Sequence, residues 1–496
     1  MKLFWMLAPI AVFANAQIKT LHASLDPSSI SKQLAFYQLY PDTPEGQKAL
    51  ACAWKLLGTN QPNKMALPTL DLQPLIALVN RQPLDEPPVL DVAALDLIDS
   101  IASHLHNRKL QGHFVWNKSD LMALPVHEID LARALLLQDV KDPIQIRQYE
   151  ATLDLMALQI GARLNLNSTD IDKINAINDF IFHEMRYRFP PHSLWTDDVD
   201  LYTFLPAVMD SRKGVCLGVS ILYLSIAQRL NLPLEIVTPP GHIYIRYRQN
   251  PDKVVNIETT ARGIDVPSKS YLSIHTKSLQ TRNIKEVIGL AFVNQAAVCW
   301  QNENHKEAIT LYEKALPYLP GDALLNMLLG YNYLFVGETA KGKHLLEQIV
   351  NQPLEGSLIC ETLPRDYLNG QASIEGIKAV FSHVDETRAS ILNKQEQLQS
   401  ILKKYPKFRD GWFHLAVTHF QLNNHAQALI ALEKLHKLDN TQPTVEYYLA
   451  QLKLMRFSPS EAWKHYEQAQ SILAKHDHKP PCMRALYQAL QMTYPK

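Results

Sequence analysis

Cysteine is scarce in this chain of 496 residues, which contains only five, and no two of them form a Cys-x-x-Cys pair. Zinc ribbons and thioredoxin-like redox motifs need such a pair and are therefore excluded. An odd number of cysteines in an exported protein leaves at least one thiol free, so one of the five can have a chemical function. The five are Cys52, Cys216, Cys299, Cys360 and Cys482.

Cofactor motifs and an excess of charge are also missing. The 17 glycines include no Gly-x-Gly-x-x-Gly run, the loop that cradles a dinucleotide phosphate. His183 and Glu184 begin the pattern of a zinc protease, but Tyr187 stands where that pattern needs its second histidine. Lysine plus arginine equals aspartate plus glutamate, at 49 each, which disfavours a nucleic-acid binder. We therefore expect no metal, no other cofactor and no nucleic-acid partner.

The first 16 residues have the pattern of a secretory signal peptide. Lys2 provides the positive start, residues 3–13 are apolar, and Ala14-Asn15-Ala16 offers the small residues at which signal peptidase cuts. The apolar run is too short to span a bilayer, and no later stretch approaches the length of a transmembrane helix. Gln17 follows the expected cut, so no lipid-anchored cysteine is predicted. The protein is expected to be exported, as a periplasmic or secreted protein.

Cys216 is the cysteine in the most reactive sequence context. It follows Gly214, where the backbone can turn tightly, and it opens an apolar stretch at 217–230 that predicts a helix. The amides at a helix N-terminus stabilise a thiolate, and the preceding Arg212 and Lys213 add positive potential. A buried, inert thiol is the usual state of a free cysteine. The surroundings of Cys216 favour a nucleophile instead.

His242 and Glu258 are the expected partners of this nucleophile. They fall on two predicted strands, one beginning at His242 and the other spanning 254–258, joined by a turn near Asn250. Matching the apolar faces of the two strands pairs even positions with even positions. A turn centred on Asn250 places Glu258 directly across from His242, and a slip of two residues places it on the diagonal. Both registers predict a nucleophile, a base and a carboxylate that orients the base.

Beyond residue 285 the sequence repeats with a period of 34 residues. The repeats start at 289 and 323, and again at 409 and 443. Small residues recur at positions 8 and 20, where two helices can approach closely, and a bulky residue recurs at position 24. This period predicts tetratricopeptide-type helical hairpins. The small residues are Ala296, Ala308, Gly330, Gly342, Ala416, Ala428, Ala450 and Ala462.

The run Lys213-Gly214-Val215-Cys216-Leu217-Gly218, and later Pro240-Gly241-His242, resembles the transglutaminase-like superfamily. The most similar branch is the SirB-type group, in which such a domain precedes tetratricopeptide repeats. The resemblance covers roughly residues 145–350 and implies a papain-like fold, with the nucleophile at Cys216 and the base at His242. The third member of the family's triad, commonly aspartate, falls on Glu258, whose side chain is longer. The oxyanion would bind the backbone amide of Cys216, with a second donor among Tyr202, Asn178 and Tyr187.

The expected fold class is α+β for the papain-like or transglutaminase-like domain, with helices packed on an antiparallel sheet, followed by an all-α solenoid. The expected divisions are a signal peptide at 1–16, a helical region of unknown role at 17–142, the transglutaminase-like domain at 143–285, repeats at 286–356, a helical linker region at 357–408, and repeats at 409–496.

The sequence predicts acyl-transfer chemistry on a peptide or protein amide, with Cys216 as nucleophile, His242 as base and Glu258 as orienting group. Hydrolysis of the thioester by water and its transfer to an amine both remain open. The repeats predict a surface that binds a protein partner. The alternative is a non-catalytic scaffold in which the repeats are the functional part.

Overall fold

The computed structural model describes residues 16–58, 73–82, 85–86, 88–165, 167–190, 202–385 and 387–496. The predicted signal peptide therefore lies outside the described residues, except for residue 16. None of the helices in these ranges combines the length and the apolar character that crossing a membrane requires.

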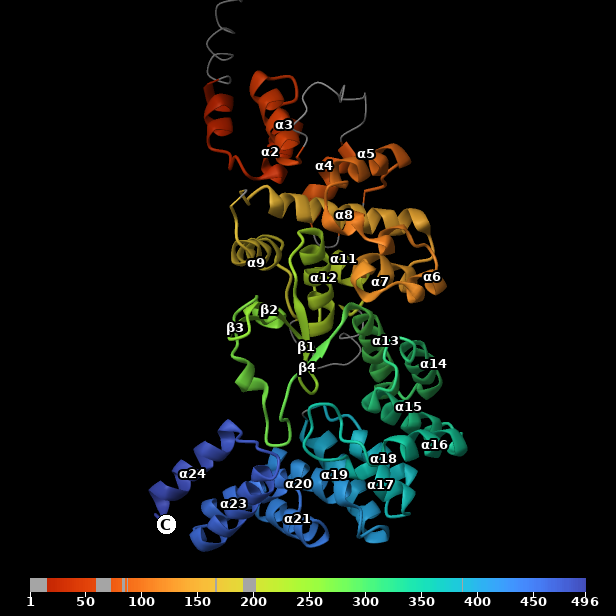
Figure 1. The fold of residues 1–496 in the computed structure, drawn as a ribbon, viewed down its shortest axis with the longest axis vertical. Coiled ribbons are helices and arrows are strands. Elements are labelled where there is room, and N and C mark those ends of the chain that lie inside the picture. The colour runs from red at the N-terminus through yellow and green to blue at the C-terminus, as the bar shows by residue number, and fades with distance from the viewer. Residues whose placement is uncertain are drawn as a thin grey trace, which may run out of the picture.

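The N-terminal region is a group of helices stacked on one long helix, α8 (Pro143–Gly161), which lies across the molecule in Figure 1. Leu155 and Leu158 of α8 join the apolar cluster of the N-terminal helices, while Leu153 and Met156 join the central core. Because both faces of α8 are apolar, it forms the shared wall of two cores. Other α-helices of this region include α2 (Ile30–Leu39), α3 (Pro44–Leu56), α4 (Gln73–Asn80), α5 (Val92–Ala102), α6 (Lys118–Ala123) and α7 (Leu131–Asp139).

The central domain packs helices on an antiparallel sheet, as the sequence predicts. Its strands follow the order β3-β2-β1-β4 in the described part of the chain. Ile245 and Ile257, on neighbouring strands, are fully buried in the same core as the middle of α12. The elements are α9 (Asp170–Asn178), the π-helix η4 (Asp179–Glu184), α11 (Leu205–Ser211), α12 (Cys216–Arg229), β1 (Glu235–Thr238), β2 (Tyr244–Asn250), β3 (Lys253–Ile257) and β4 (Gln280–Arg282).

The repeats form helical hairpins at the predicted places. A Cβ atom added at Gly342 would lie 2.8 Å from the Gly330 carbonyl oxygen, so only a small residue allows the two helices to touch. Ala416 and Ala428 are buried at the same positions of a later hairpin. The paired helices are α13 (Ile284–Gln301) with α14 (His305–Ala315), α15 (Ala323–Phe335) with α16 (Thr339–Ile349), α20 (Arg409–Gln421) with α21 (His425–Leu438), and α22 (Pro443–Met455) with α23 (Pro459–Ala474).

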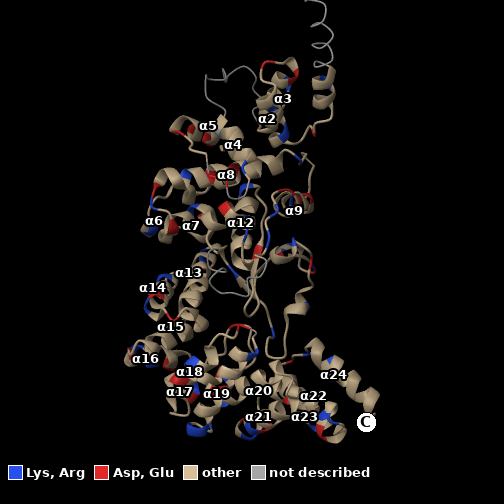
Figure 2. Ribbon diagram, turned by 180° about the vertical axis from the view of Figure 1, so that it is seen from behind, with Lys and Arg blue, Asp and Glu red and all other residues tan. Residues whose placement is uncertain are grey.

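Three further helices, α17 (Thr362–Leu368), α18 (Ile374–Phe381) and α19 (Arg388–Lys404), join the two groups of repeats, and α24 (Pro481–Thr493) follows them. A long loop after β3 reaches these C-terminal helices, as Figure 1 shows. Ile274 of this loop packs in the apolar cluster of α22–α24, and the Ser273 carbonyl oxygen contacts His478 Nε2 at 2.8 Å. The loop therefore ties the central domain to the end of the solenoid. Acidic and basic residues occur along the whole ribbon, in keeping with the zero net charge (Figure 2).

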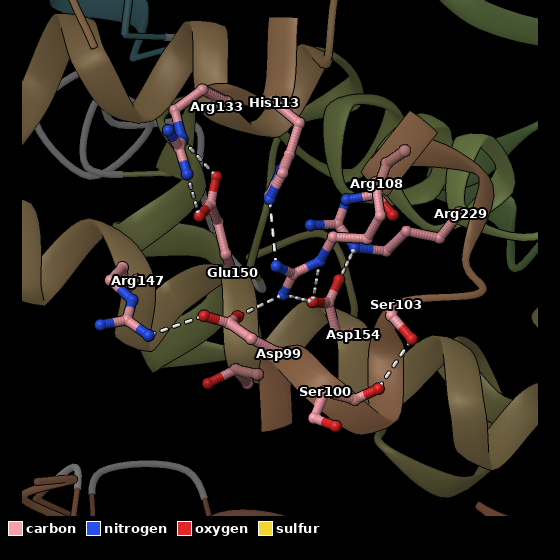
Figure 3. A network of polar contacts seen from close by, with 12 residues as sticks. Asp99, Ser100, Ser103, Arg108, His113, Arg133, Arg147, Glu150, Asp154 and Arg229 are labelled. Carbon is pink, nitrogen blue, oxygen red and sulfur yellow. Dashed lines mark hydrogen bonds and ion pairs between the residues drawn. The ribbon is translucent and has the colours of Figure 1, made fainter. Parts of the chain in front are cut away.

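A buried network of charges fixes α12 to the N-terminal region (Figure 3). Asp154, which is fully buried on α8, accepts a hydrogen bond from Arg229 Nε at 2.7 Å and another from Arg108 Nε at 3.0 Å. Arg108 continues to Asp99 at 2.7 Å. The arginine at the end of α12 is therefore held by a carboxylate of α8, the helix that both cores share.

We expect Asp154→Asn to lower the free energy of unfolding by about 3–5 kcal/mol, because it leaves the buried Arg229 guanidinium without its carboxylate, while Arg108 keeps only Asp99. Urea unfolding followed by circular dichroism measures this change. Asp96→Asn is the matched control, since the Asp96 side chain is 65% exposed and its ion pair with Arg147 lies at the surface. A loss at Asp154 no larger than the control's loss would contradict the structural role of the network.

Candidate active site

Cys216 is the first residue of α12, and within the described residues no side chain caps the start of this helix. The free amides of the first turn therefore face the space around the sulfur. Gly218 allows a second segment to approach, because a Cβ atom there would lie 2.1 Å from the carbonyl oxygen of Tyr202. The same oxygen accepts a hydrogen bond from the Val215 amide at 3.3 Å. These contacts place residue 202 beside the start of the helix and leave Cys216 half-buried.

His242 lies in the turn before β2 rather than on the strand, which begins two residues later, at Tyr244. Gly241 supplies the positive φ of this turn, at 69°, and the His242 amide closes it by donating to the Pro239 carbonyl oxygen at 3.0 Å. The turn directs the imidazole toward the residue that follows β3. His242 Nε2 and Glu258 Oε2 are 2.7 Å apart.

The pairing of β2 with β3 is the diagonal alternative of the two registers. Ile245 lies opposite Ile257 and Arg246 opposite Asn256, so continuing the ladder sets Glu258 against Tyr244. Relative to a register with His242 directly opposite Glu258, the strands are offset by two residues. The even-with-even pairing is preserved, and Glu258 still faces the imidazole.

The electrostatics of His242 favour its charged form. Hydrogen bonding to Cys216, and then to Glu258, raises the pKa of His242 to about 10. Since Glu258 holds Nε2, Nδ1 is the ring nitrogen left for the sulfur. The structure thus brings Cys216, His242 and Glu258 together in that order. Their catalytic role stays a prediction.

Glu258 is buried and held by several donors. Tyr271 donates its hydroxyl to Oε2 at 2.6 Å, and Thr260 donates its hydroxyl to Oε1 at 2.7 Å. Burial by itself would raise the pKa of Glu258, but the hydrogen bonds from His242, Tyr271 and Thr260 outweigh it and lower the pKa to about 2. The carboxylate is therefore ionised and fixed over the whole neutral range.

Tyr271 is a site residue that the sequence does not indicate. Its ring stacks on Tyr244 at a centroid distance of 4.6 Å and on His242 at 5.8 Å. The loop that carries it is anchored by Asn256, whose amide donates to the Val266 carbonyl oxygen at 2.6 Å. In the sequence, the one signal for an anchored loop is a polar residue, Asn256, in the middle of an apolar strand.

Thr259 links the end of β3 to the start of α12. Its hydroxyl lies 3.4 Å from the Cys216 carbonyl oxygen and 3.1 Å from the Ser220 hydroxyl. Both Thr259 and Ser220 are buried. This contact holds the element bearing Glu258 against the element bearing the thiol.

The candidates for a second oxyanion donor differ in their surroundings. Tyr187 is buried, and its hydroxyl donates to the Met209 carbonyl oxygen at 3.4 Å. The Asn178 side chain accepts a hydrogen bond from Tyr223 at 3.1 Å and packs against Gly263. Tyr202 contacts the segment that begins α12 through its backbone carbonyl oxygen, which is an acceptor, so these contacts do not identify a second donor.

Comparison with known proteins matches residues 147–291 to the family model described as the transglutaminase-like superfamily. No curated protein matches the chain. A solved structure described as "Crystal structure of MamA" is 15% identical, with 36% of this chain and 94% of that chain covered and a TM-score of 0.21. The solved structure of a thermophilic TPR protein from Thermus thermophilus is 16% identical, with 41% of this chain and 98% of that chain covered and a TM-score of 0.22. The tetratricopeptide assignment in this chain rests on its own period of 34 residues and its helical hairpins.

The pH dependence of stability is expected to reveal the His242–Glu258 ion pair. The pKa of His242 is raised from 6.5 to about 10, so its contribution is complete below pH 6.5 and is lost as the pH rises through about 10. The pKa of Glu258 is lowered from 4.5 to about 2, so its contribution is complete above pH 4.5 and is lost as the pH falls through about 2. We expect His242→Gln to destabilise most between these limits, at pH 4.5–6.5, by about 1–2 kcal/mol after solvent screening. Thermal unfolding across pH measures the difference.

Tyr271→Phe tests the acid limit of this window. Loss of the hydroxyl raises the pKa of Glu258, so stability falls at a higher pH, while the alkaline limit set by His242 stays in place. Tyr247→Phe is the matched control, because it removes a hydroxyl on β2 that donates to a different carboxylate, that of Asp170, at 3.1 Å. Identical acid limits in the two variants would refute the role given to Tyr271.

Proposed function

Because residues 147–291 form a transglutaminase-like domain, we propose that this protein is a cysteine-dependent acyl-transfer enzyme that acts on a peptide or protein amide. The observation that carries the proposal is the chain of contacts from Cys216 through His242 to Glu258. It supplies a nucleophile, a proton carrier and a group that orients the carrier.

In the proposed reaction His242 first takes the thiol proton of Cys216. The sulfur attacks the amide carbonyl carbon, and the carbonyl electrons move onto oxygen. The backbone amide of Cys216 would donate to that oxyanion, and the uncapped start of α12 supports this role. His242 gives its proton to the leaving nitrogen, so the C–N bond breaks and a thioester remains. Glu258 keeps the imidazole in place during both proton transfers.

In the second half of the reaction, His242 takes a proton from water or from an amine as that nucleophile attacks the thioester. Water gives hydrolysis, as in a protease or amidase, and an amine gives transfer, as in a transglutaminase. The sulfur then leaves and the acyl group is released. The contacts around His242 serve either nucleophile equally, so the proposal covers both outcomes.

The helical repeats support a peptide or protein as the substrate or partner, because repeat solenoids present extended binding surfaces. A cleft of about 1120 Å³ lies where the loop bearing Tyr271 meets the last repeat. Lys269 and Leu272 line it from the loop, and Tyr466 and Arg484 line it from the solenoid. A polypeptide segment bound there would lie next to the residue that holds Glu258.

The test is a peptide-amide library offered with and without a primary amine, with intact mass spectrometry of the protein. We expect an acyl adduct on Cys216, and the released product identifies water or amine as the second nucleophile. Cys216→Ala should abolish the adduct, and Glu258→Gln should slow its formation by about 10- to 1000-fold.

Thiol reactivity separates this function from the non-catalytic scaffold. Burial raises the pKa of the Cys482 thiol, which makes it an internal reference for an inert cysteine. At pH 6 we expect iodoacetamide to modify Cys216 at least about tenfold faster than Cys482, and His242→Ala to remove the difference. Equal rates, together with no acyl adduct, would favour the scaffold.

We further propose that the enzyme is exported and acts in the cell envelope. The support is the charge, apolar run and small residues of the first 16 positions, which lie almost wholly outside the described residues. Expression in a Gram-negative host should give mature protein beginning at Gln17 in the periplasmic fraction, as read by N-terminal mass spectrometry. Full-length protein confined to the cytoplasmic fraction would contradict export.

A further inference from the structure

Three potential metal ligands from three different helices meet in the C-terminal repeats. Glu446 of α22 lies between His436 of α21 and His465 of α23. Its Oε1 is 2.5 Å from His436 Nδ1, and its Oε2 is 2.8 Å from His465 Nδ1. The three ligand atoms lie within 4.8 Å of one another. They are too far apart in the sequence to form a recognisable metal motif.

Glu446 is the buried member of this cluster, and a buried carboxylate needs a compensating positive charge. Glu446 is fully buried, and both of its ion-pair partners are imidazoles. A neutral imidazole donates a hydrogen bond but brings no positive charge, whereas a buried carboxylate needs one. A metal ion bound by the three side chains would supply it.

A second cluster in the described residues shows the usual solution with arginine. His113, Asp130 and Glu150 also lie within ligand distance of one another and are all buried. There Arg133 binds Glu150 through two hydrogen bonds of 2.6 and 2.7 Å, and Arg108 contacts His113 at 3.0 Å. Guanidinium groups therefore already neutralise the N-terminal cluster, whereas among the described residues no such group is paired with Glu446.

We propose that His436, Glu446 and His465 bind a zinc ion. Two imidazole nitrogens and a carboxylate are a donor set that zinc accepts, and a tetrahedral ion with bonds of about 2.0–2.2 Å keeps its donors about 3.3 Å apart. Since the three ligand atoms lie within 4.8 Å of one another, they reach that spacing by side-chain shifts of no more than about 1.5 Å. The zinc replaces the shared protons and balances the Glu446 charge.

The exposure of the ligands indicates where the fourth coordination position lies. The His436 side chain is 32% exposed, that of His465 is 13% exposed, and Glu446 is closed off from solvent. Water therefore reaches the ion from the His436 side. Because each ligand belongs to a different helix, the ion fastens α21, α22 and α23 together and stiffens the junction of the last two repeats.

Zinc titration of the full-length, chelator-stripped protein tests this site. The parent is Cys216→Ser, because a thiol beside an imidazole is itself a zinc ligand pair. We expect calorimetry to find one zinc ion per chain, cobalt to give the absorbance of a tetrahedral site, and zinc to raise the melting temperature. Loss of an outer-shell partner typically costs 10- to 100-fold in affinity, so loss of a ligand should cost more than about 100-fold.

His436→Gln is the main variant, because His436 is the most exposed of the three ligands and its loss disturbs packing least. Glu446→Gln is the second, and it keeps the shape of the buried side chain. His425→Ala, at the start of the same helix α21, is the matched control and should bind zinc like the parent. The proposal fails if the parent binds no zinc, or if both ligand variants bind it as tightly as the parent.

Discussion

The buried carboxylate of Asp154 is the interaction on which the arrangement of the site depends. It accepts hydrogen bonds from Arg229, the last residue of α12, and from Arg108 of the N-terminal region. The opposite end of that helix carries Cys216, 13 residues away (229 − 216) and roughly 20 Å along the axis. A charge pair between α8 and α12 thus fixes the helix that presents the thiol. This contact also gives the N-terminal helices a structural role, since α8 belongs to both cores.

At the other end of the helix, several weak contacts set the position of the thiol, in place of one ion pair. Thr259 holds the end of β3 to the first turn of α12, and Gly218 lets the backbone of Tyr202 approach the same turn. The strand offset of two residues lengthens the path from β3 to His242. A glutamate at 258 is one methylene longer than an aspartate, and its Oε2 reaches the imidazole at 2.7 Å.

The loop after β3 connects this chemistry to the solenoid. It carries Tyr271, which holds Glu258, and a few residues later Ile274 packs among the C-terminal helices. One loop therefore links the last repeats to the hydrogen bond that holds the Glu258 carboxylate. A zinc ion among α21, α22 and α23 would stiffen the same region, and it would act independently of whether the thiol reacts.

The sequence by itself determined the features that depend on local periodicity. A glycine before an apolar helical run indicated the helix of Cys216, and the 34-residue period predicted the hairpins. Strand alternation suggested one face for His242 and Glu258, but His242 lies in the turn before β2 and Glu258 follows β3. Only the tertiary structure decided the features that join distant segments. These are the choice of strand register, the stacking of Tyr271 on His242, the hold of Asp154 on α12, and the meeting of His436 with Glu446 and His465. The reason is physical. The periodicity of apolar residues is a property of a single helix or strand, whereas a buried charge pair or a hydrogen bond between elements depends on how their faces pack.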